Sequence, residues 1–278
     1  MKKTTQIVVH GDCASFLPAN TPKGGFNLIF SDPPFNIGRE YENNRDCLPV
    51  NEYVKFTHRW LDACKNALAD GGVLCVHGPD QLARIVIRRE RALGLEPIAW
   101  VNLLYSFGQC TRRNWVDART HCLFYAKGER GTWNHDDVLV ESMRSSTYAD
   151  KRVTQTERGG KRLPGTIWGL KPYDNERWGR VQGTSKERWN VKNGALMDHD
   201  NQIPINVVRR IVLAYTNPGD NVCDPFVGSG TTGLVAKHEG RNFVGFDTGK
   251  VTAASALKRI KCGWYPESLQ PKGSPDDN

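Results

Sequence analysis

Short apolar runs alternate along the chain with patterns typical of helices. Runs rich in β-branched and aromatic residues predict strands at 6–12, 26–32, 72–78, 98–105, 121–128, 221–226 and 242–247. Their near-continuous apolarity is typical of strands that are covered on both faces. Amphipathic patterns predict helices at 51–72, ending at Gly71 and Gly72, and at 203–220, ending at a Pro-Gly turn. This alternation predicts an α/β domain built around a largely parallel sheet.

One predicted strand ends in an unusual sequence. Residues 30–37 read FSDPPFNI, so an acid, two prolines and an aromatic ring follow the apolar run 26–30. Proline cannot donate a hydrogen bond to a neighbouring strand and restricts the residue before it, so the strand must stop in a stiff, extended turn. A strand terminator needs only one proline and neither the acid nor the ring. The stretch alone leaves a structural and a functional role equally open.

A second informative stretch runs from 221 to 247. A predicted strand leads into Gly228, Gly230 and Gly233, and a short helical pattern and a second strand follow, ending at Asp247. This order is typical of nucleotide-binding folds, in which glycines let a ligand approach the backbone and the distal acid accepts hydrogen bonds from ribose hydroxyls. No Gly-Lys-Ser/Thr sequence follows, which excludes a Walker loop. A nicotinamide-dependent oxidoreductase stays open as a competing class, although Asp224 inside the strand counts against it.

The glycine unit comes late in the chain, so the other strands of its sheet must come from the N-terminal half. In a doubly wound sheet, ligands bind at the carboxyl ends of strands around the point where the strand order reverses. We therefore expect Asp12, Asp32, the loop 226–233 and Asp247 to face one crevice. The acid and the prolines at Asp32 then lie beside an adenosine-type ligand.

Positive charge is concentrated in one segment. The formal net charge is +8, and residues 144–192 carry twelve bases against five acids, a net of +7. Trp168, Trp178 and Trp189 are interleaved with these bases. A solvated insertion is one interpretation, but clustered bases with aromatic residues suit a phosphate backbone. The segment predicts a nucleic-acid partner.

Composition limits the remaining possibilities. With 278 residues and 38% hydrophobic content, the chain can bury a proper core. The eight cysteines contain no Cys-x-x-Cys pair and the seven histidines are scattered, so we expect neither disulfides nor a metal site. The N-terminal apolar run is too short for a signal peptide or a membrane span. We therefore expect a cytoplasmic protein without membrane contact.

These stretches together resemble a known family. DPPF at 32–35 and DPFVGSGTT at 224–232 resemble the paired signatures of the S-adenosylmethionine-dependent DNA amino-methyltransferases, as catalytic motif and cofactor loop. Their order along the chain is similar to that of the β class. HGDC at 10–13 resembles the N-terminal cofactor motif, 119–128 the strand that lines the target-base pocket, and 199–212 the helix motif before the cofactor strand. Only the basic segment 144–192 resembles none of the family motifs.

The resemblance implies a fold and a division of the chain. It implies the class I methyltransferase fold, a Rossmann-like, doubly wound, mostly parallel sheet in circularly permuted order, with a basic target-recognition insertion. Residues 1–143 form the catalytic part, 144–195 the insertion and 196–278 the cofactor-binding part. The implied cofactor is S-adenosyl-L-methionine, and the implied partner is double-stranded DNA. Many β-class relatives are dimers, so we also expect a homodimer, and a partner endonuclease stays an open question.

Asp32 suggests which atom accepts the methyl group. Transfer to an amino nitrogen is a positioning problem, and a carboxylate with the Pro33 carbonyl can accept the two amino hydrogens and stabilise developing positive charge. Phe35 can stack on a base that has been swung out of the duplex. Within the family, Asp at the first motif position is typical of adenine-N6 enzymes and Ser of many cytosine-N4 enzymes. No Pro-Cys pair is present, which speaks against cytosine-C5 chemistry.

The prediction is therefore a site-specific DNA methyltransferase acting on adenine N6. A cytosine-N4 enzyme, an RNA methyltransferase and a nicotinamide-dependent oxidoreductase are the alternatives. The predicted catalytic residues are Asp32, Pro33, Pro34 and Phe35. The predicted cofactor-binding residues are Asp12, Cys13, Asp32, Gln202, Asp224, Phe226, Gly228, Ser229, Gly230, Thr231, Thr232 and Asp247. The predicted DNA-binding residues are Arg39, Lys161, Arg162, Arg177, Arg180, Lys186 and Arg188.

Overall fold

An eight-stranded sheet forms the centre of the protein. The computed structural model describes residues 4–264 except 44, 106–114, 143, 145–147, 149, 156, 170–187 and 200. The strands follow in the order β1 (Gln6–His10), β10 (Asn242–Asp247), β9 (Asn221–Asp224), β2 (Phe26–Ser31), β3 (Leu68–Gly78), β5 (Arg119–Ala126), β4 (Glu96–Leu104) and β8 (Ile167–Trp168). β5 runs antiparallel to both neighbours, and the other described pairs in this sheet are parallel. The predicted doubly wound, mostly parallel sheet is confirmed.

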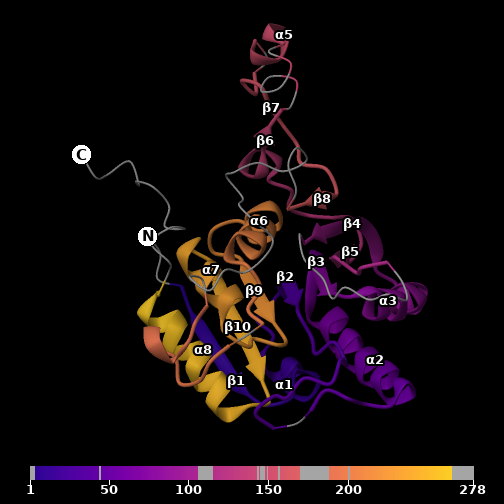
Figure 1. Ribbon diagram of the computed structural model, residues 1–278, viewed down its shortest axis with the longest axis vertical. Helices are drawn as coiled ribbons and strands as arrows, with labels where there is room; N and C mark the ends of the chain where they lie inside the picture. The colour runs from indigo at the N-terminus through magenta and orange to yellow at the C-terminus, as the bar shows by residue number, and fades with distance from the viewer. Residues whose placement is uncertain are drawn as a thin grey trace.

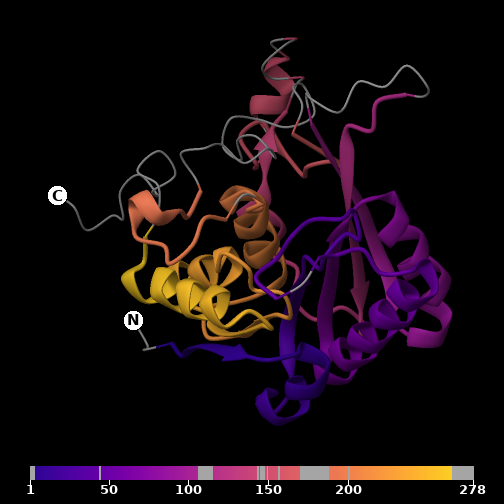
Figure 2. The same cartoon turned by 60° about the horizontal axis from the view of Figure 1, so that its bottom comes forward.

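Helices cover both faces of this sheet (Figure 1, Figure 2). One face packs against α6 (Ile205–Tyr215), α7 (Thr231–His238) and α8 (Lys250–Cys262), and the other against α1 (Cys13–Asn20), α2 (Val50–Ala67) and α3 (Asp80–Leu93). In β2, Leu28 and Phe30 enter the first apolar cluster, whereas Ile29 enters the second. Successive side chains in a strand point to opposite faces, so a strand buried on both faces has no polar alternation.

The last strands of the chain lie among the first. β10 and β9 insert between β1 and β2, with Val9 opposite Phe246 and Ile29 opposite Cys223. This is the predicted arrangement, in which the glycine unit is last in sequence and central in the sheet. Because these strands are parallel, their carboxyl ends all reach the same edge.

The predicted boundary at the paired glycines was wrong. α2 ends at Ala67, and Gly71 and Gly72 lie inside β3. A Cβ atom on Gly72 would lie 2.6 Å from the carbonyl oxygen of Phe26, and one on Gly71 would lie 2.9 Å from the amide nitrogen of Gly131. The glycines therefore allow β3 to approach its neighbours, a task that a helix pattern does not reveal.

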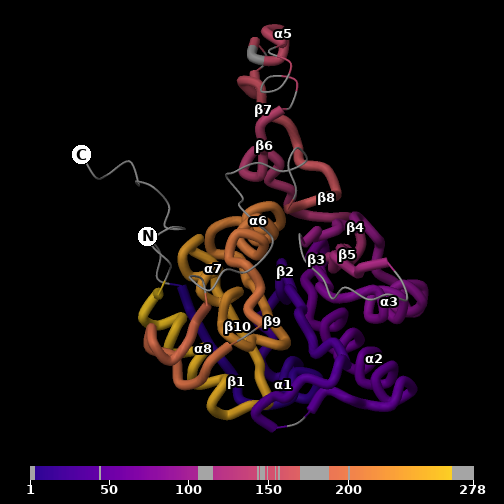
Figure 3. The backbone as a smooth tube through the Cα atoms, viewed as in Figure 1, coloured from indigo at the N-terminus to yellow at the C-terminus, as the bar shows by residue number. Residues whose placement is uncertain are grey.

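A slender arm projects from the body (Figure 1, Figure 3). We call the described residues between 140 and 168 the arm; it contains β6 (Val140–Glu141), α5 (Lys151–Thr154) and β7 (Lys161–Arg162), and β6 pairs antiparallel with β7. At its base lie η1 (His135–Val138) and Trp168, whose ring stacks 4.2 Å from the guanidinium carbon of Arg210 on α6. The arm falls largely within the predicted insertion, whose boundaries at 144 and 195 stay a prediction.

None of the described helices is both long and apolar enough to cross a membrane.

Candidate active site

Carboxylates gather where the parallel strands end. His10 pairs with Asp247 across β1 and β10, and Asp224 pairs with Gly245 across β9 and β10. Asp32 directly follows β2, whose last residue, Ser31, pairs with Val76 of β3. Asp32 and Asp247, two of the acids predicted to share a crevice, thus lie with Asp224 at one edge of the sheet.

Asp224 is the most deeply buried of these acids. Its Oδ1 accepts a hydrogen bond from the Phe226 amide at 3.0 Å, and its Oδ2 accepts one from the Thr232 hydroxyl at 2.5 Å. Burial raises the pKa of Asp224 to about 7, although these two hydrogen bonds oppose the shift. The negative charges of Asp32 and Asp247 raise this pKa further, because both repel a negative charge on Asp224.

Asp247 joins the glycine loop to the start of α8. Its Oδ2 accepts from the Gly228 amide at 3.1 Å and its Oδ1 from the Gly249 amide at 2.8 Å. Its backbone carbonyl accepts from the Gly11 amide at 2.8 Å. Burial raises the pKa of Asp247, and the two amide hydrogen bonds counteract this. The carboxylate is held in a fixed direction at the end of β10, as a ribose acceptor requires.

The hydroxyl groups of the glycine loop serve the loop itself. The Ser229 and Thr231 oxygens lie 3.0 Å apart, and each accepts a hydrogen bond from Nη1 of Arg259, at 3.2 and 3.1 Å. Arg259 is fully buried on α8, below the loop. Since Thr232 donates to Asp224, all three side chains are engaged within the protein. A cofactor on this loop would therefore meet backbone groups.

Gly230 has a packing role in addition to any role at a ligand. Its φ of +81° lies in the left-handed region that favours glycine. A Cβ atom there would lie 3.1 Å from Cα of Ala256 on α8. The structure therefore shows that this glycine lets the loop pack on a helix, and its role at a ligand stays a prediction.

The other predicted cofactor residues differ in their surroundings. Oδ2 of Asp12 accepts from the Ser15 hydroxyl at 3.0 Å and lies 3.4 Å from Nη2 of Arg59. Cys13 is buried in the core, and burial raises the pKa of its thiol to about 12, so its backbone is the part that can meet a cofactor. Oε1 of Gln202 accepts from the backbone amide of Trp189 at 3.0 Å.

Trp189 ties the end of the basic segment to the cofactor half. Its indole nitrogen donates to the Ser255 hydroxyl at 3.1 Å, and η2 (Val191–Asn193) follows it. Phe226, by contrast, points toward α2, where its ring lies 5.4 Å from the ring of Trp60. Phe226 therefore fixes the start of the glycine loop by packing.

The DPPF turn is held by three contacts. Nδ1 of His77 lies 2.8 Å from Oδ1 of Asp32, whose side chain is 23% exposed. The Phe35 ring packs edge-on to His77, with centroids 5.8 Å apart. The Tyr53 hydroxyl donates to the Pro34 carbonyl at 2.8 Å, and Pro33 is buried. The strand pattern at 72–78 does not distinguish His77 from its neighbours, and its place at the end of β3 is the signal that would have identified it.

A loop from 36 to 48 lies against the same edge. The Asp46 carboxylate accepts from the backbone amides of Asn36 and Arg39. Glu42 accepts from the amides of Val251 and Thr252 at the start of α8, both at 2.9 Å. Negative charge at a helix N-terminus is stabilising. The loop thereby lies close to Asp247. Arg39, a predicted DNA-binding residue, is exposed on this loop.

The predicted DNA-binding residues fall into two groups. Lys161 and Arg162 form β7 of the arm, and Arg188 directly precedes the buried Trp189. Arg177, Arg180 and Lys186 lie outside the described residues.

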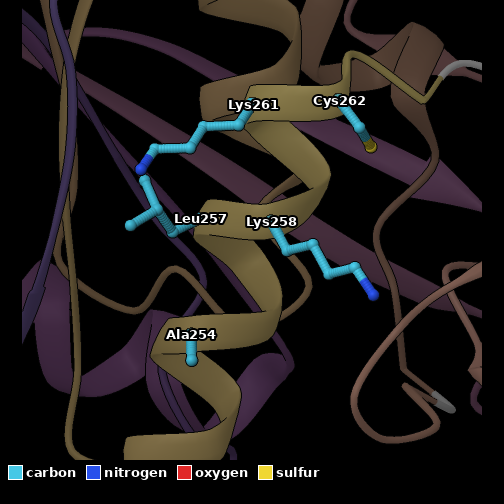
Figure 4. A pocket seen from close by; sticks show the side chains of 5 residues that line it. All are labelled: Ala254, Leu257, Lys258, Lys261 and Cys262. Carbon is cyan, nitrogen blue, oxygen red and sulfur yellow. The ribbon is translucent and has the colours of Figure 1, made fainter.

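Two surface pockets lie apart from the residues described above. One, of about 410 Å³, follows the outer side of α8 and is lined by Ala254, Leu257, Lys258, Lys261 and Cys262 (Figure 4). The other, of about 560 Å³, lies between α1 and α2. Since α8 starts at the carboxyl edge and runs away from it, the lysines of the first pocket lie toward the opposite edge.

Comparison with curated proteins gives relatives that match over most of their lengths. The type II methyltransferase M.HpaI of Haemophilus parainfluenzae is 29% identical over 252 residues, which cover 89% of this chain and 73% of that protein. The DNA adenine methyltransferase YhdJ of Escherichia coli (strain K12) is 27% identical over 261 residues, which cover 92% and 82%.

Solved structures share the fold. The cytosine-N4-specific PvuII DNA methyltransferase superposes with a TM-score of 0.65 at 18% identity, covering 92% of this chain and 87% of that one. M1.HpyAVI, solved in complex with SAM, superposes with a TM-score of 0.57 at 17% identity, covering 91% and 98%. The expected class I methyltransferase fold is confirmed.

The family model described as DNA methylase, which covers N6 and N4 methyltransferases, matches residues 26–258. This match confirms the family suggested by the DPPF and glycine-loop motifs, and the alternatives of a nicotinamide-dependent oxidoreductase and an RNA methyltransferase were wrong. The chain belongs to the N6/N4 family of DNA methylases.

Proposed function

We propose that this protein is a site-specific DNA methyltransferase that methylates adenine N6 in double-stranded DNA. The methyl donor is S-adenosyl-L-methionine. The observation that carries the choice of adenine is the carboxylate of Asp32, at the first position of the DPPF turn and close enough to the cofactor half that its charge raises the pKa of Asp224. The homodimer and the restriction or orphan context stay predictions.

The acids at the carboxyl edge suit this cofactor. When bound, S-adenosylmethionine supplies a methyl group on a positively charged sulfur. A cation beside Asp224 relieves the repulsion among three carboxylates, which is otherwise a cost of the fold. Asp247, held by the Gly228 and Gly249 amides, is oriented to accept hydrogen bonds from the ribose. The glycine loop presents backbone groups to the rest of the ligand.

Asp32 and Phe35 act on the target base. The lone pair of an exocyclic amino group is delocalised into the ring, so the nitrogen is a poor nucleophile. Asp32 and the Pro33 carbonyl accept its hydrogens, which favours a pyramidal nitrogen and stabilises the positive charge that develops there. Phe35 stacks on the base after it leaves the duplex, which offsets part of the few kcal/mol lost in unstacking.

The arm provides a surface for the DNA backbone. Basic side chains lie along the arm. Lys151, Arg152 and Lys161 are exposed, and Arg162 is half-buried. Asp150 caps the start of α5 and pairs with Arg144 and Arg152 at 3.0 Å, so some positive charge at the tip is compensated. Lys161 and Arg162 on β7 are therefore the better candidates for phosphate contacts.

The proposed function is tested by identifying the methylated base. The protein is incubated with S-adenosylmethionine and duplex DNA, which is digested to nucleosides and analysed by mass spectrometry. We expect N6-methyldeoxyadenosine from the wild type, none above background from Asp32→Ala, and a severe loss in Asp32→Asn, because the amide carries no charge. N4-methyldeoxycytidine as the product would overturn the adenine assignment, and wild-type turnover in Asp32→Ala would overturn the role of the turn.

Cofactor affinity is expected to depend on pH through Asp224. A bound cation favours the charged carboxylate, so S-adenosylmethionine lowers the pKa of Asp224 from about 7 and releases protons on binding. The affinity for S-adenosylmethionine should rise as the pH rises toward 7 and level off above it, with a total gain of roughly tenfold for each unit by which binding lowers the pKa of Asp224. S-adenosylhomocysteine lacks the sulfonium charge and should show a flatter profile. Calorimetry in buffers of different ionisation enthalpy measures both, and equal slopes for the two ligands would contradict this account.

DNA affinity is expected to depend on salt through the arm. The logarithm of affinity should fall linearly with the logarithm of salt concentration, by roughly 0.9 for each phosphate neutralised. Replacing Lys161 and Arg162 by alanine should lower this slope by about 1.8 if both contact phosphates. Lys258→Ala with Lys261→Ala on α8 removes the same charge away from the carboxyl edge and serves as the control. Equal slopes for the two double variants, measured by fluorescence anisotropy, would exclude the arm from the phosphate contacts.

A further inference from the structure

A line of hydrogen bonds runs from Asp32 into the sheet. Nδ1 of His77 on β3 lies 2.8 Å from Oδ1 of Asp32. Nε2 of His77 lies 2.9 Å from the hydroxyl oxygen of Thr120 on β5, and that oxygen lies 2.6 Å from the hydroxyl of Tyr105, directly after β4. Four adjacent segments of the carboxyl edge thus contribute one group each.

The directions of these bonds follow from the chemistry of the groups. An ionised carboxylate only accepts, so Nδ1 of His77 must carry a proton and donate to Asp32. In a neutral imidazole the other nitrogen then accepts, so the Thr120 hydroxyl donates to Nε2 and the Tyr105 hydroxyl donates to Thr120. Every donor points toward Asp32. This arrangement holds Oδ1 of Asp32 against His77, so the other oxygen, Oδ2, is the one that we expect to accept from a target amino group.

His77 is buried and packed between neighbouring segments. Its side chain is 7% exposed, Phe35 packs against it edge-on, and Cys122 lies opposite it in the β3–β5 register. The titratable groups that face it are Asp32 from the DPPF turn, Cys122 from β5 and, through Thr120, Tyr105. Burial lowers the pKa of His77, but the charge and hydrogen bond of Asp32 outweigh burial, so the pKa lies above its ordinary value.

The reaction requires Asp32, the first group of this hydrogen-bonded line, to be held in position. When the nitrogen lone pair forms the new N–C bond, the electrons of the S–C bond stay on sulfur and the nitrogen becomes positive. It must then lose one of its hydrogens as a proton, and Asp32 is the nearest base. A carboxylate placed about 1 Å away from the productive position costs on the order of 10²-fold in rate.

We propose that His77 is the positioning residue of Asp32, fixed in turn by Thr120 and Tyr105, and that methyl transfer requires its neutral form. This inference rests on the proposed function. A cationic His77 would also donate at Nε2, which forces Thr120 to reverse its hydrogen bond, and it would neutralise the carboxylate that must accept the target hydrogens. The transfer rate therefore rises as His77 loses its proton.

The first test compares His77→Asn with His77→Ala in single-turnover methyl transfer across pH. Alanine should lower the rate constant on the order of 10²-fold with little change in the affinity for DNA or S-adenosylmethionine. The asparagine amide can donate to Asp32 but does not titrate. This variant should therefore recover part of the rate and lose the pH step, which is the rise in rate constant as His77 loses its proton. His121→Asn is the matched control, because His121 is also buried and also pairs with an acid, with Nε2 2.6 Å from Oδ1 of Asp80. It should keep the pH step whatever its rate.

The second test does not depend on methylation. Imidazole nitrogen NMR of the full chain should show His77 titrating above the ordinary histidine value, and Asp32→Asn should move that titration to lower pH. A wild-type pH step in His77→Asn, or an unmoved His77 titration in Asp32→Asn, would overturn the proposal. If the wild type methylates cytosine N4, the base assignment fails while both tests of His77 still apply.

Discussion

The pairing of two late strands between two early ones is the constraint on which the rest of this structure depends. β10 and β9 insert between β1 and β2. The acids at the ends of three of these strands, Asp32, Asp224 and Asp247, therefore meet although they are far apart in the chain. The Gly11 amide donates to the Asp247 carbonyl and joins the early and late segments at this edge, while the Gly228 amide holds the glycine loop to the Asp247 carboxylate. The glycine loop and the DPPF turn therefore reach the same edge of the sheet from distant parts of the chain.

This convergence has an electrostatic cost. Burial and the neighbouring charges of Asp32 and Asp247 raise the pKa of Asp224 to about 7, so the protein alone does not fully stabilise the charged form. The buried Arg259 supports the glycine loop from below through Ser229 and Thr231. This edge is thus ordered by hydrogen bonds within the protein, and we expect a bound cation to stabilise the charged form of Asp224.

Much of the fold could be predicted from the sequence. Apolar continuity revealed strands covered on both faces, and the order of the motifs predicted that the glycine unit is last in sequence and central in the sheet. The helix boundary at Gly71 was wrong because a glycine inside a strand and one that ends a helix look alike without the neighbouring Phe26 and Gly131. His77, Glu42 and Asp46 were missed because their roles depend on partners from other segments of the chain.

In the proposed function, the carboxyl edge of the sheet has a cofactor side at Asp247 and a target side at Asp32. Calorimetric titration of S-adenosylmethionine into Asp247→Ala and Asp32→Ala tests it most directly. We expect Asp247→Ala to weaken binding on the order of 1.5–3 kcal/mol, because charge-assisted ribose hydrogen bonds are lost, and Asp32→Ala to bind S-adenosylmethionine with close to wild-type affinity. Unchanged binding in Asp247→Ala, or equal losses in both variants, would contradict it.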